Sequence, residues 1–415
     1  MLRLLKKAVI PVAVAALVVG LAGCSGSSST TSKKDAKGPL TVWIMGDAGK
    51  NFQTLVAPFE KSTGEKVNVV EIPWDSVSAK LTTAVASGNG PDVTEVGLSS
   101  LRSFSDAGAL MDLDGKLSAY PNLASSNFAP GVAGQATAIQ GKIVSVPWIS
   151  DTRVLFYRSD ILTAAGITAP PTTWDAVRAD AKILAARGKG DYGYYIPQWD
   201  DALPVELTWG QGGDIINKSG NVDLNTPAFT KMVDFYTGLY ADKSVPTNSD
   251  FDQTQGFITG AAPMLVSGPY LAQAIKTAAP DLAGKWSIET LPSNNTSLFA
   301  GSNMSVWKNT TRPNGSLKLL NYLSEPSVQL KWYKLDGDLP TVNKALTDPS
   351  FTSDPLVKVY SAQLKNAKLL PLISNYDGGV GADILKALNS IALTGADKAS
   401  TLSALYAQTS SMSIK

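Results

Sequence analysis

The 415-residue chain contains no histidine and a single cysteine. Without histidine, a Ser-His-Asp or Cys-His nucleophilic site is excluded, and so is every metal centre that depends on imidazole ligands. A single cysteine excludes an internal disulfide, a cysteine-rich zinc site and an iron–sulfur cluster. The sequence therefore predicts neither a cofactor nor a metal. The two counts also exclude most common catalytic arrangements.

Neither sign of charge is in large excess, because 36 lysine and arginine side chains stand against 35 acidic ones. Segment 1–37 holds a net charge of +5, so the rest of the chain carries −4. A mildly acidic body offers no electrostatic attraction for nucleic acid. The 44% hydrophobic and 17% charged composition is that of a globular protein. The length supports roughly two to three domains, or one large body with two lobes.

The amino terminus contains only a short hydrophobic run, from Ala8 to Ala22, preceded by basic residues. Fifteen residues are too few to span a bilayer comfortably, but they match the apolar region of a signal peptide. The next residues, Leu21-Ala22-Gly23-Cys24, resemble the lipobox of bacterial lipoproteins. That resemblance implies that 1–23 is a signal peptide and that the sulfur of Cys24 is diacylated. The alternative is a buried cysteine at the end of a core helix.

Residues 24–38 comprise Cys24 and a segment rich in serine and threonine that has no apolar periodicity. Such segments behave as flexible coils. We therefore expect a linker that tethers the protein body, through the lipid on Cys24, to the extracytoplasmic face of the cell membrane.

The body begins with three strand-like segments, Leu40–Ile44, Val67–Ile72 and Asp92–Val96, spaced about 25 residues apart with helical patterns between them. This order is typical of a βαβαβ unit and predicts a largely parallel sheet. In the first helical pattern, Pro58 is expected to kink or end the helix.

In the rest of the chain, strand and helix patterns alternate less regularly. The whole pattern predicts an α/β fold. Two further strand-like segments, Ile143–Val146 and Val154–Tyr157, flank Pro147–Asp151. Helical patterns cover 174–187, 203–212, 227–241, 317–323 and 328–335, and two amphipathic helices are predicted between residues 382 and 406.

Nine short sequence blocks follow one another along the body, and their order and spacing together are specific. They are Val42–Gly49, Phe59–Val67, Gly90–Val93, Ala107–Leu113, Gly141–Pro147, Leu155–Asp160, Trp209–Gly213, Ser267–Tyr270 and Gly301–Asn303. Together they resemble the extracellular solute-binding proteins of ABC importers, in the carbohydrate-binding family that includes maltose/maltodextrin-binding protein. The resemblance covers about residues 39–410.

The resemblance implies a bilobed periplasmic-binding-protein-like fold, in which two α/β lobes are joined by a hinge with several crossings. Lobe 1 would comprise 39–150 plus about 302–340, and lobe 2 would comprise 151–301 plus about 341–415. The crossings are expected near Trp148–Asp151, Gly301 and Leu339–Asn343. Ligand would favour a closed form that docks on a membrane permease, because only the closed form lets ligand touch both lobes.

A sugar offers hydroxyl groups, which favour charged acceptors, and C–H faces, which favour flat aromatic rings. Nine tryptophans and thirteen tyrosines supply such rings, and several lie in predicted loops at strand ends, where open α/β sheets bind ligands. The candidate ligand-binding residues are Asp47, Ser99, Ser100, Trp148, Asp151, Gln198, Trp199, Tyr270, Gly301, Ser302 and Tyr376.

Three of these candidates match family positions of the expected type. By resemblance, Asp47 and Asp151 take the places of sugar-binding acids, and Tyr270 takes the place of a stacking tryptophan. Asp47 has an alternative role as the N-cap of the following helix.

Other candidates depart from the maltodextrin branch. Ser99 and Ser100 stand where that branch has a polar charged pair, and Gln198 stands where an acid is expected. These departures argue for a sugar other than maltose. Helix capping is the alternative role for the two serines, and wedging the hinge is the alternative for Trp148. Four tryptophans are expected in the core: Trp43, Trp209, Trp307 and Trp332.

The predicted function is a monomeric, lipid-anchored, non-enzymatic receptor that delivers a neutral mono- or oligosaccharide to an ABC permease. Asp47 and Asp151 would repel an anionic ligand, which favours a neutral one. Three alternatives remain. The same two carboxylates could hydrolyse a glycoside, Tyr194-Tyr195 resembles the phenolate pair of ferric-ion binding proteins, and an anchored adhesin or sensor needs no permease.

Overall fold

The computed structural model describes residues 35–129, 137–374 and 376–414, and the structural statements below concern these residues. Cys24 and the predicted signal peptide lie outside them. Among the described residues, no helix combines the length and the apolar character needed to cross a membrane.

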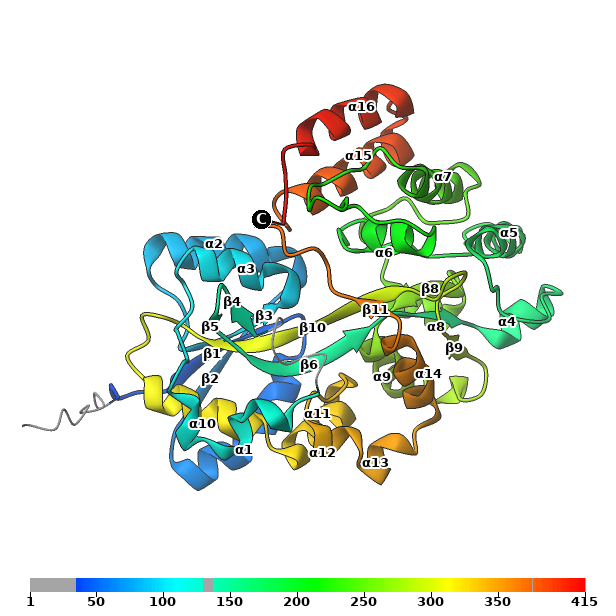
Figure 1. Ribbon diagram of the computed structural model, residues 1–415. Helices are drawn as coiled ribbons and strands as arrows, with labels where there is room; N and C mark the ends of the chain where they lie inside the picture. Colours follow the sequence, from blue (N-terminus) through cyan, green and yellow to red (C-terminus); the bar gives the residue numbers. More distant parts are fainter. Residues whose placement is uncertain (1–34, 130–136, 375, 415) are drawn as a thin grey trace, which may run out of the picture. The chain divides into compact units, whose positions relative to one another are not determined.

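The first sheet has six strands, and its order is β11-β10-β3-β1-β2 with β6 paired to β10. Neighbours β1 and β2, β1 and β3, and β10 and β11 are parallel, whereas β10 runs antiparallel to β3 and to β6. The strands are β1 (Leu40–Met45), β2 (Val67–Ile72), β3 (Val93–Gly97), β6 (Val146–Thr152), β10 (Ser297–Val306) and β11 (Ala367–Lys368) (Figure 1). The predicted parallel β1–β2–β3 unit is thus confirmed.

The second sheet has three antiparallel strands in the order β8-β7-β9, and a two-stranded ribbon pairs β4 with β5. Strand β7 covers the predicted segment Val154–Tyr157, and all four of its residues are buried. The other strands are β8 (Met264–Ser267), β9 (Ser287–Glu289), β4 (Ala138–Ile139) and β5 (Lys142–Ile143).

Helices pack on both sheets (Figure 1). Those of the first half of the chain are α1 (Gly49–Thr63), α2 (Val77–Ser87), α3 (Leu98–Asp106), α4 (Ser159–Ala164), α5 (Trp174–Ala185) and α6 (Leu203–Gly210). Those of the middle are α7 (Pro227–Ala241), α8 (Gln253–Thr259), α9 (Pro269–Ala278), α10 (Pro313–Leu323) and α11 (Pro326–Asp336). The last are α12 (Asn343–Leu346), α13 (Pro349–Thr352), α14 (Pro355–Leu364), α15 (Val380–Thr394) and α16 (Lys398–Thr409). Short 3₁₀ turns lie at Trp74–Ser76, Leu117–Ala119, Pro121–Leu123, Ser125–Asn127 and Pro280–Leu282.

Two local expectations concern Pro58 and the segment Pro147–Asp151. Helix α1 does not end at Pro58 but continues to Thr63 and ends at Gly64, which adopts the left-handed conformation of a C-cap, and a kink at Pro58 stays a prediction. The segment Pro147–Asp151, expected to connect two strands, is itself the body of β6. Its backbone pairs with β10, a strand about 150 residues away in the sequence, and no local pattern reveals such a partner.

The buried hydrophobic clusters form two groups, and the chain passes from one group to the other at three places. Two hydrophobic clusters surround the first sheet and draw their fully buried members from residues 40–148 and 304–345. Two others surround the second sheet, with members from 154–298, 351–405 and Leu339. The chain thus passes from one group of cores to the other along β6, along β10 and near Leu339.

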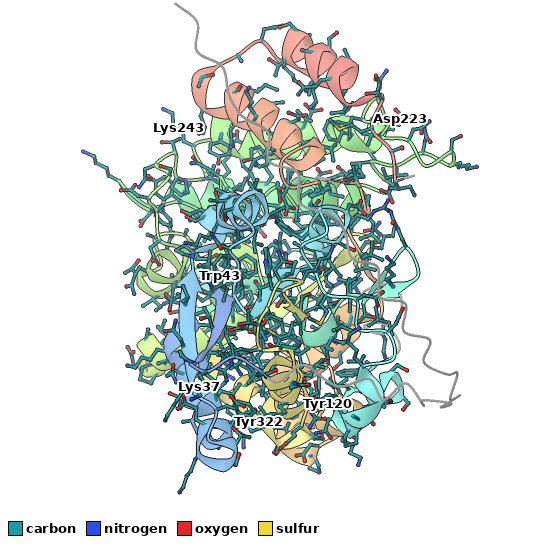
Figure 2. All side chains as sticks on the ribbon, turned by 90° about the vertical axis from the view of Figure 1, so that its left-hand side faces the viewer. Lys37, Trp43, Tyr120, Asp223, Lys243 and Tyr322 are labelled. Atoms are coloured by element: carbon teal, nitrogen blue, oxygen red, sulfur yellow. The ribbon has the colours of Figure 1, made fainter. Side chains whose placement is uncertain are left out.

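The four tryptophans expected in the core are buried there. Trp209, Trp307 and Trp332 are each 2% exposed. Trp43, on β1, is also buried, and the ammonium of Lys80 lies 5.3 Å from its ring centroid (Figure 2).

Candidate ligand-binding site

The strands that connect the two groups of cores, β6 and β10, approach each other unusually closely at Gly301. Its φ is +128°, and a Cβ at this position would lie 2.3 Å from the carbonyl oxygen of Ile149. Glycine is therefore required here by the backbone itself. The prediction that Gly301 contacts ligand is not tested by this geometry.

Asp151 lies on β6 at this crossing and is partly exposed. Its Oδ1 atom is buried and accepts no hydrogen bond from the described residues. Glycine at position 268 makes room for the carboxylate, since a Cβ there would lie 2.7 Å from Asp151 Oδ2 and 3.0 Å from the ring of Tyr270. Burial raises the pKa of Asp151 to about 7, although the positive charge of Arg153 and a hydrogen bond from the backbone N–H of Thr152 lower it. The site thus holds a carboxylate with unused acceptor capacity.

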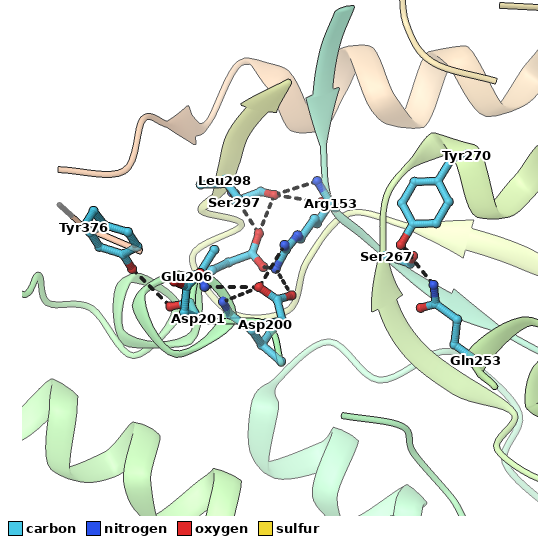
Figure 3. A network of polar contacts seen from close by, with 12 residues as sticks. Arg153, Asp200, Asp201, Glu206, Gln253, Ser267, Tyr270, Ser297, Leu298 and Tyr376 are labelled. Carbon is cyan, nitrogen blue, oxygen red and sulfur yellow. Dashed lines mark hydrogen bonds and ion pairs between the residues drawn. The ribbon is translucent and has the colours of Figure 1, made fainter. Parts of the chain in front are cut away.

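Tyr270 lies beside this carboxylate, in the first turn of α9, and its side chain is 37% exposed. Its hydroxyl is held from two sides, by the hydroxyl of Ser267 at 3.0 Å and the side-chain amide of Gln253 at 3.1 Å (Figure 3). Fixing the hydroxyl orients the ring while leaving part of it open, as a stacking residue requires.

Arg153, two residues after Asp151, belongs to an ionic network that joins the end of β6 and the start of β10 to α6 (Figure 3). Arg153 Nη1 lies 2.7 Å from Asp200 Oδ2 and 3.7 Å from Glu206 Oε2. Glu206 Oε1 accepts hydrogen bonds from the hydroxyl of Ser297 and the backbone N–H of Leu298, both at 2.8 Å. One largely buried guanidinium, whose side chain is 17% exposed, therefore faces two buried carboxylates next to the strand that carries Asp151.

The network holds two acidic groups and one basic group, and this imbalance affects their pKa values. Burial raises the pKa of Glu206, while Arg153 and the hydrogen bonds lower it. Burial lowers the pKa of Arg153, but Asp200 and Glu206 raise it well above its ordinary value. The guanidinium is therefore fully committed to its two partners.

A further buried carboxylate, Glu95, lies on β3 and is 3% exposed. Its Oε2 accepts the backbone N–H of Met45 at 3.0 Å, and its Oε1 accepts the hydroxyl of Ser302. Ser302 itself is fully buried. The prediction that Ser302 contacts ligand is therefore contradicted, because the hydroxyl is enclosed and already used in joining β10 to β3.

Stability should depend on pH through Glu95. Burial raises its pKa from 4.5 to about 7, despite the hydrogen bonds from Ser302 and Met45 that lower it. The folded state therefore binds a proton more tightly than the unfolded state, so the contribution of Glu95 is full below pH 4.5 and is lost as the pH rises to about 7. Urea unfolding from pH 4.5 to 8 should show this loss, and Glu95→Gln should flatten it. An equal slope in both proteins would refute the assignment.

Ser99 and Ser100 begin α3, yet neither caps it. The N-cap is Gly97, and no side chain hydrogen-bonds to the first turn, so the capping alternative is wrong. The hydroxyl of Ser100 instead donates to Asp377 Oδ2. Ser100 and Asp377 line a cavity between α2, α3 and the segment before α15, whose other lining residues are Ser78, Thr82, Val85, Ser103, Phe104, Ala107 and Ser374.

Asp47 is exposed just after β1. The N-cap of α1 is Ala48, and no side-chain cap is formed, so the alternative role of Asp47 is also excluded. Its carboxylate has no hydrogen-bond partner within the described part of the chain and is free to meet a ligand.

The prediction that Trp148 stacks on a sugar ring is contradicted, because Trp148 is only 1% exposed. Its ring centroid lies 6.0 Å from that of Phe52 and 5.4 Å from that of Trp332, within the core beneath the first sheet. Its alternative role, wedging the hinge, stays a prediction.

The prediction that Tyr376 contacts ligand is also contradicted by burial. Its ring is fully buried in the core of the second sheet, and its hydroxyl donates to the carbonyl oxygen of Asp201 at 3.0 Å (Figure 3). The neighbouring candidates differ. Trp199 is 53% exposed, whereas the side-chain amide of Gln198 donates to the carbonyl of Thr247 at 3.0 Å. Trp199 is thus open to ligand, and Gln198 is partly committed to a structural bond.

The tyrosine pair considered as a ferric-ion site is enclosed in two cores. Tyr194 is 1% and Tyr195 is 7% exposed, and they belong to different hydrophobic clusters. Burial raises the pKa of Tyr195 to about 12 and that of Tyr194 further, which opposes formation of a phenolate ligand. Across the described residues, no group of three His, Cys, Asp or Glu side chains is arranged to hold a metal ion.

Sequence reasoning missed the acidic groups around the crossing. Asp338 accepts the indole N–H of Trp332 at 3.0 Å, Asp336 accepts the side-chain amide of Asn51 at 2.9 Å, and burial raises the pKa of both carboxyls. For Glu95 a signal was present, since an acidic residue inside a predicted strand that also contains Val93 and Val96 indicates a buried carboxylate. For Asp336 and Asp338 no such signal was found.

Comparison with known proteins identifies the architecture. Residues 43–330 match the family described as bacterial extracellular solute-binding protein. The chain belongs to this family. It is 27% identical to the maltodextrin-binding protein MdxE of Bacillus subtilis (strain 168) over 384 residues, with 89% of each chain covered.

Solved structures agree with this family. The solute-binding protein superimposes on the sugar-binding protein MalE of Xanthomonas citri with a TM-score of 0.73 and 25% identity, covering 90% of this chain and 96% of that one. The GacH receptor of Streptomyces glaucescens, solved unliganded and with acarbose and an acarbose homolog, gives a TM-score of 0.80 at 25% identity, with 90% and 97% covered. The predicted bilobed periplasmic-binding-protein-like fold is confirmed.

Proposed function

We propose that this solute-binding protein binds a neutral mono- or oligosaccharide between two lobes and delivers it to an ABC permease. The observation that carries the proposal is Asp151, whose buried Oδ1 lacks a partner among the described residues and whose neighbour is the partly exposed ring of Tyr270. A carboxylate with unused acceptor capacity beside an aromatic ring matches the hydroxyl groups and the C–H face of one sugar ring.

The separation of the cores supports the proposed lobes. Lobe 1 contains the first sheet and Asp47, and lobe 2 contains the second sheet and Tyr270. The chain crosses between them along β6, along β10 and near Leu339. A ligand that contacts both sides favours closure, because it gains the second set of contacts only in the closed form.

Similarity supports sugar as the ligand class. The MalE of Xanthomonas citri is a sugar-binding protein, and GacH was solved with acarbose. An uncharged ligand fits best here, because the only cation in the described network, Arg153, is already occupied by Asp200 and Glu206. A binding role without catalysis also agrees with the family, whose members bind solutes.

Isothermal titration calorimetry against a panel of sugars tests this function. Maltotriose, N,N′-diacetylchitobiose, acarbose and D-mannitol represent a linear glucan, an N-acetylated disaccharide, a pseudo-oligosaccharide and a linear alditol, and short peptides and Fe³⁺ serve as controls. We expect one-to-one binding of at least one carbohydrate and no change in the sugar during prolonged incubation. Binding of peptide or Fe³⁺ with no carbohydrate bound would contradict the proposal, and turnover of the sugar would contradict the non-catalytic role.

We further propose that Cys24, outside the described residues, anchors the protein to the membrane. Because the chain has one cysteine, Cys24→Ser removes the only thiol that can be acylated. In bacteria labelled with an alkyne analogue of palmitate, the wild type should be labelled and sediment with membranes. The variant should lose the label and appear in the soluble fraction. Equal sedimentation of the two proteins would refute the anchor, and Ser28→Ala, a change in the same serine-rich segment, is the matched control.

A further inference from the structure

Trp74 is an exposed tryptophan whose position has no explanation in the core. It lies in the 3₁₀ turn Trp74–Ser76, directly after β2, and 47% of its surface is exposed. Carboxyl ends of parallel strands are where open α/β sheets bind ligands. An exposed indole at this edge therefore lies where a ligand is expected, unlike an isolated apolar residue on a helix surface.

The indole lies across the ends of two neighbouring strands, and both contact points are glycine. A Cβ at Gly46, just after β1, would lie 2.8 Å from Trp74 Nε1. A Cβ at Gly97, the last residue of β3, would lie 3.8 Å from Cζ3 at the other end of the ring system. The ring therefore spans from the end of β1 to the end of β3, resting on backbone from which side chains are absent.

Gly46 has a φ of +81°, so its glycine is favoured both by the backbone conformation and by the indole above it. The contact holds the ring at the sheet edge without enclosing it. A tryptophan held on one side and exposed on the other is suited to present an apolar surface to a ligand.

Two polar residues adjoin the glycines on which this ring rests. Asp47 follows Gly46 in the chain, and the Ser99 hydroxyl lies 3.9 Å from the position a Cβ would take at Gly97. Neither side chain makes a hydrogen bond within the described residues. The sheet edge therefore offers a ring, a carboxylate and a hydroxyl, all of them available.

We propose that Trp74 is the sugar-stacking residue of lobe 1, with Asp47 and Ser99 binding the hydroxyls of the same ring. The inference rests on the proposed function and names its substrate class more narrowly. A stacked contact needs a rigid C–H face, which a pyranose ring has and a linear alditol lacks. Trp74 therefore selects pyranosides over linear polyols, and it takes the place that sequence had given to Trp148.

Calorimetry on the full protein and three variants tests this role, with maltotriose, N,N′-diacetylchitobiose and D-mannitol as probes. For the pyranoside that binds best, Trp74→Ala should weaken binding about tenfold, whereas Trp74→Phe, which keeps a ring, should stay within about threefold of the wild type. Ile183→Ala removes an apolar side chain of similar exposure, 49%, from α5 and should leave binding unchanged. Circular dichroism should show that all three variants fold as the wild type does.

The outcomes separate this inference from the proposed function. If the wild type binds a pyranoside and Trp74→Ala binds it equally well, Trp74 is not a stacking residue, while the proposed function stands. If D-mannitol binds more tightly than either pyranoside, the substrate class is wrong. If the wild type binds no carbohydrate, the proposed function fails and the inference fails with it.

Discussion

Replacing Asp151 by asparagine is expected to weaken sugar binding by about 10- to 100-fold. At pH 8, where most of Asp151 is ionised, a hydrogen bond to this charged acceptor contributes roughly 1.5–3 kcal/mol, about twice the contribution of a neutral one. Asparagine preserves the volume of the side chain, so the change isolates the charge and the second acceptor oxygen. The loss should appear as a higher dissociation constant in calorimetry.

Matched variants distinguish the carboxylate from general effects of charge. Asp281→Asn alters an exposed aspartate in a 3₁₀ turn and should bind as the wild type does. Tyr270→Ala should also weaken binding strongly, whereas Tyr270→Phe keeps the ring and loses only the bonds to Ser267 and Gln253. We expect Tyr270→Phe to stay within a few-fold of the wild type. Wild-type affinity in both Asp151→Asn and Tyr270→Ala would place the sugar elsewhere.

Replacing Arg153 by methionine is expected to destabilise the folded protein by about 3–5 kcal/mol, because removing one partner of a buried ion pair leaves uncompensated charge. Here two carboxylates would be left, those of Asp200 and Glu206, whose side chains are 8% and 0% exposed. Glu206, whose pKa is already raised by burial, would be driven to bind a proton, so the loss of stability should be larger at pH 8 than at pH 5.

Urea unfolding measures this effect when circular dichroism and tryptophan fluorescence report the same transition. Arg102→Met is the control, since Arg102 pairs with Asp106 at 3.0 Å on the outer face of α3, where both side chains are more than 20% exposed. Such a pair contributes only about 0.3–0.5 kcal/mol. A loss of less than about 1 kcal/mol in Arg153→Met would show that the buried network does not hold the crossing strands.

Local patterns predicted most of the elements correctly, because strand and helix periodicities are properties of short segments. Leu40–Ile44 and Val154–Tyr157 are both strands, and the tail forms the two predicted helices, α15 and α16. The failures arose where distant segments meet. Pro147–Asp151 is a strand only because β10 pairs with it, and α1, which packs against β2 and α11, does not end at Pro58.

The site was harder to predict because the exposure of each side chain depends on tertiary packing. Trp148, Ser302 and Tyr376 have the right chemistry for sugar contacts, yet each is enclosed by residues that lie far away in the sequence. Trp74 shows the converse. Its open position depends on Gly46 and Gly97, whose missing side chains create the space on which the indole rests. Asp151 and Tyr270 remain predictions supported by their position at the crossing.

The position of a bound sugar in a crystal structure of the complex tests the central claim most directly. Our account predicts that the pyranoside chosen by calorimetry lies between the lobes, with a hydroxyl within hydrogen-bond distance of Asp151 Oδ1 and a ring face on Tyr270. A sugar bound away from both residues, with Asp151 Oδ1 still unpaired, would contradict it.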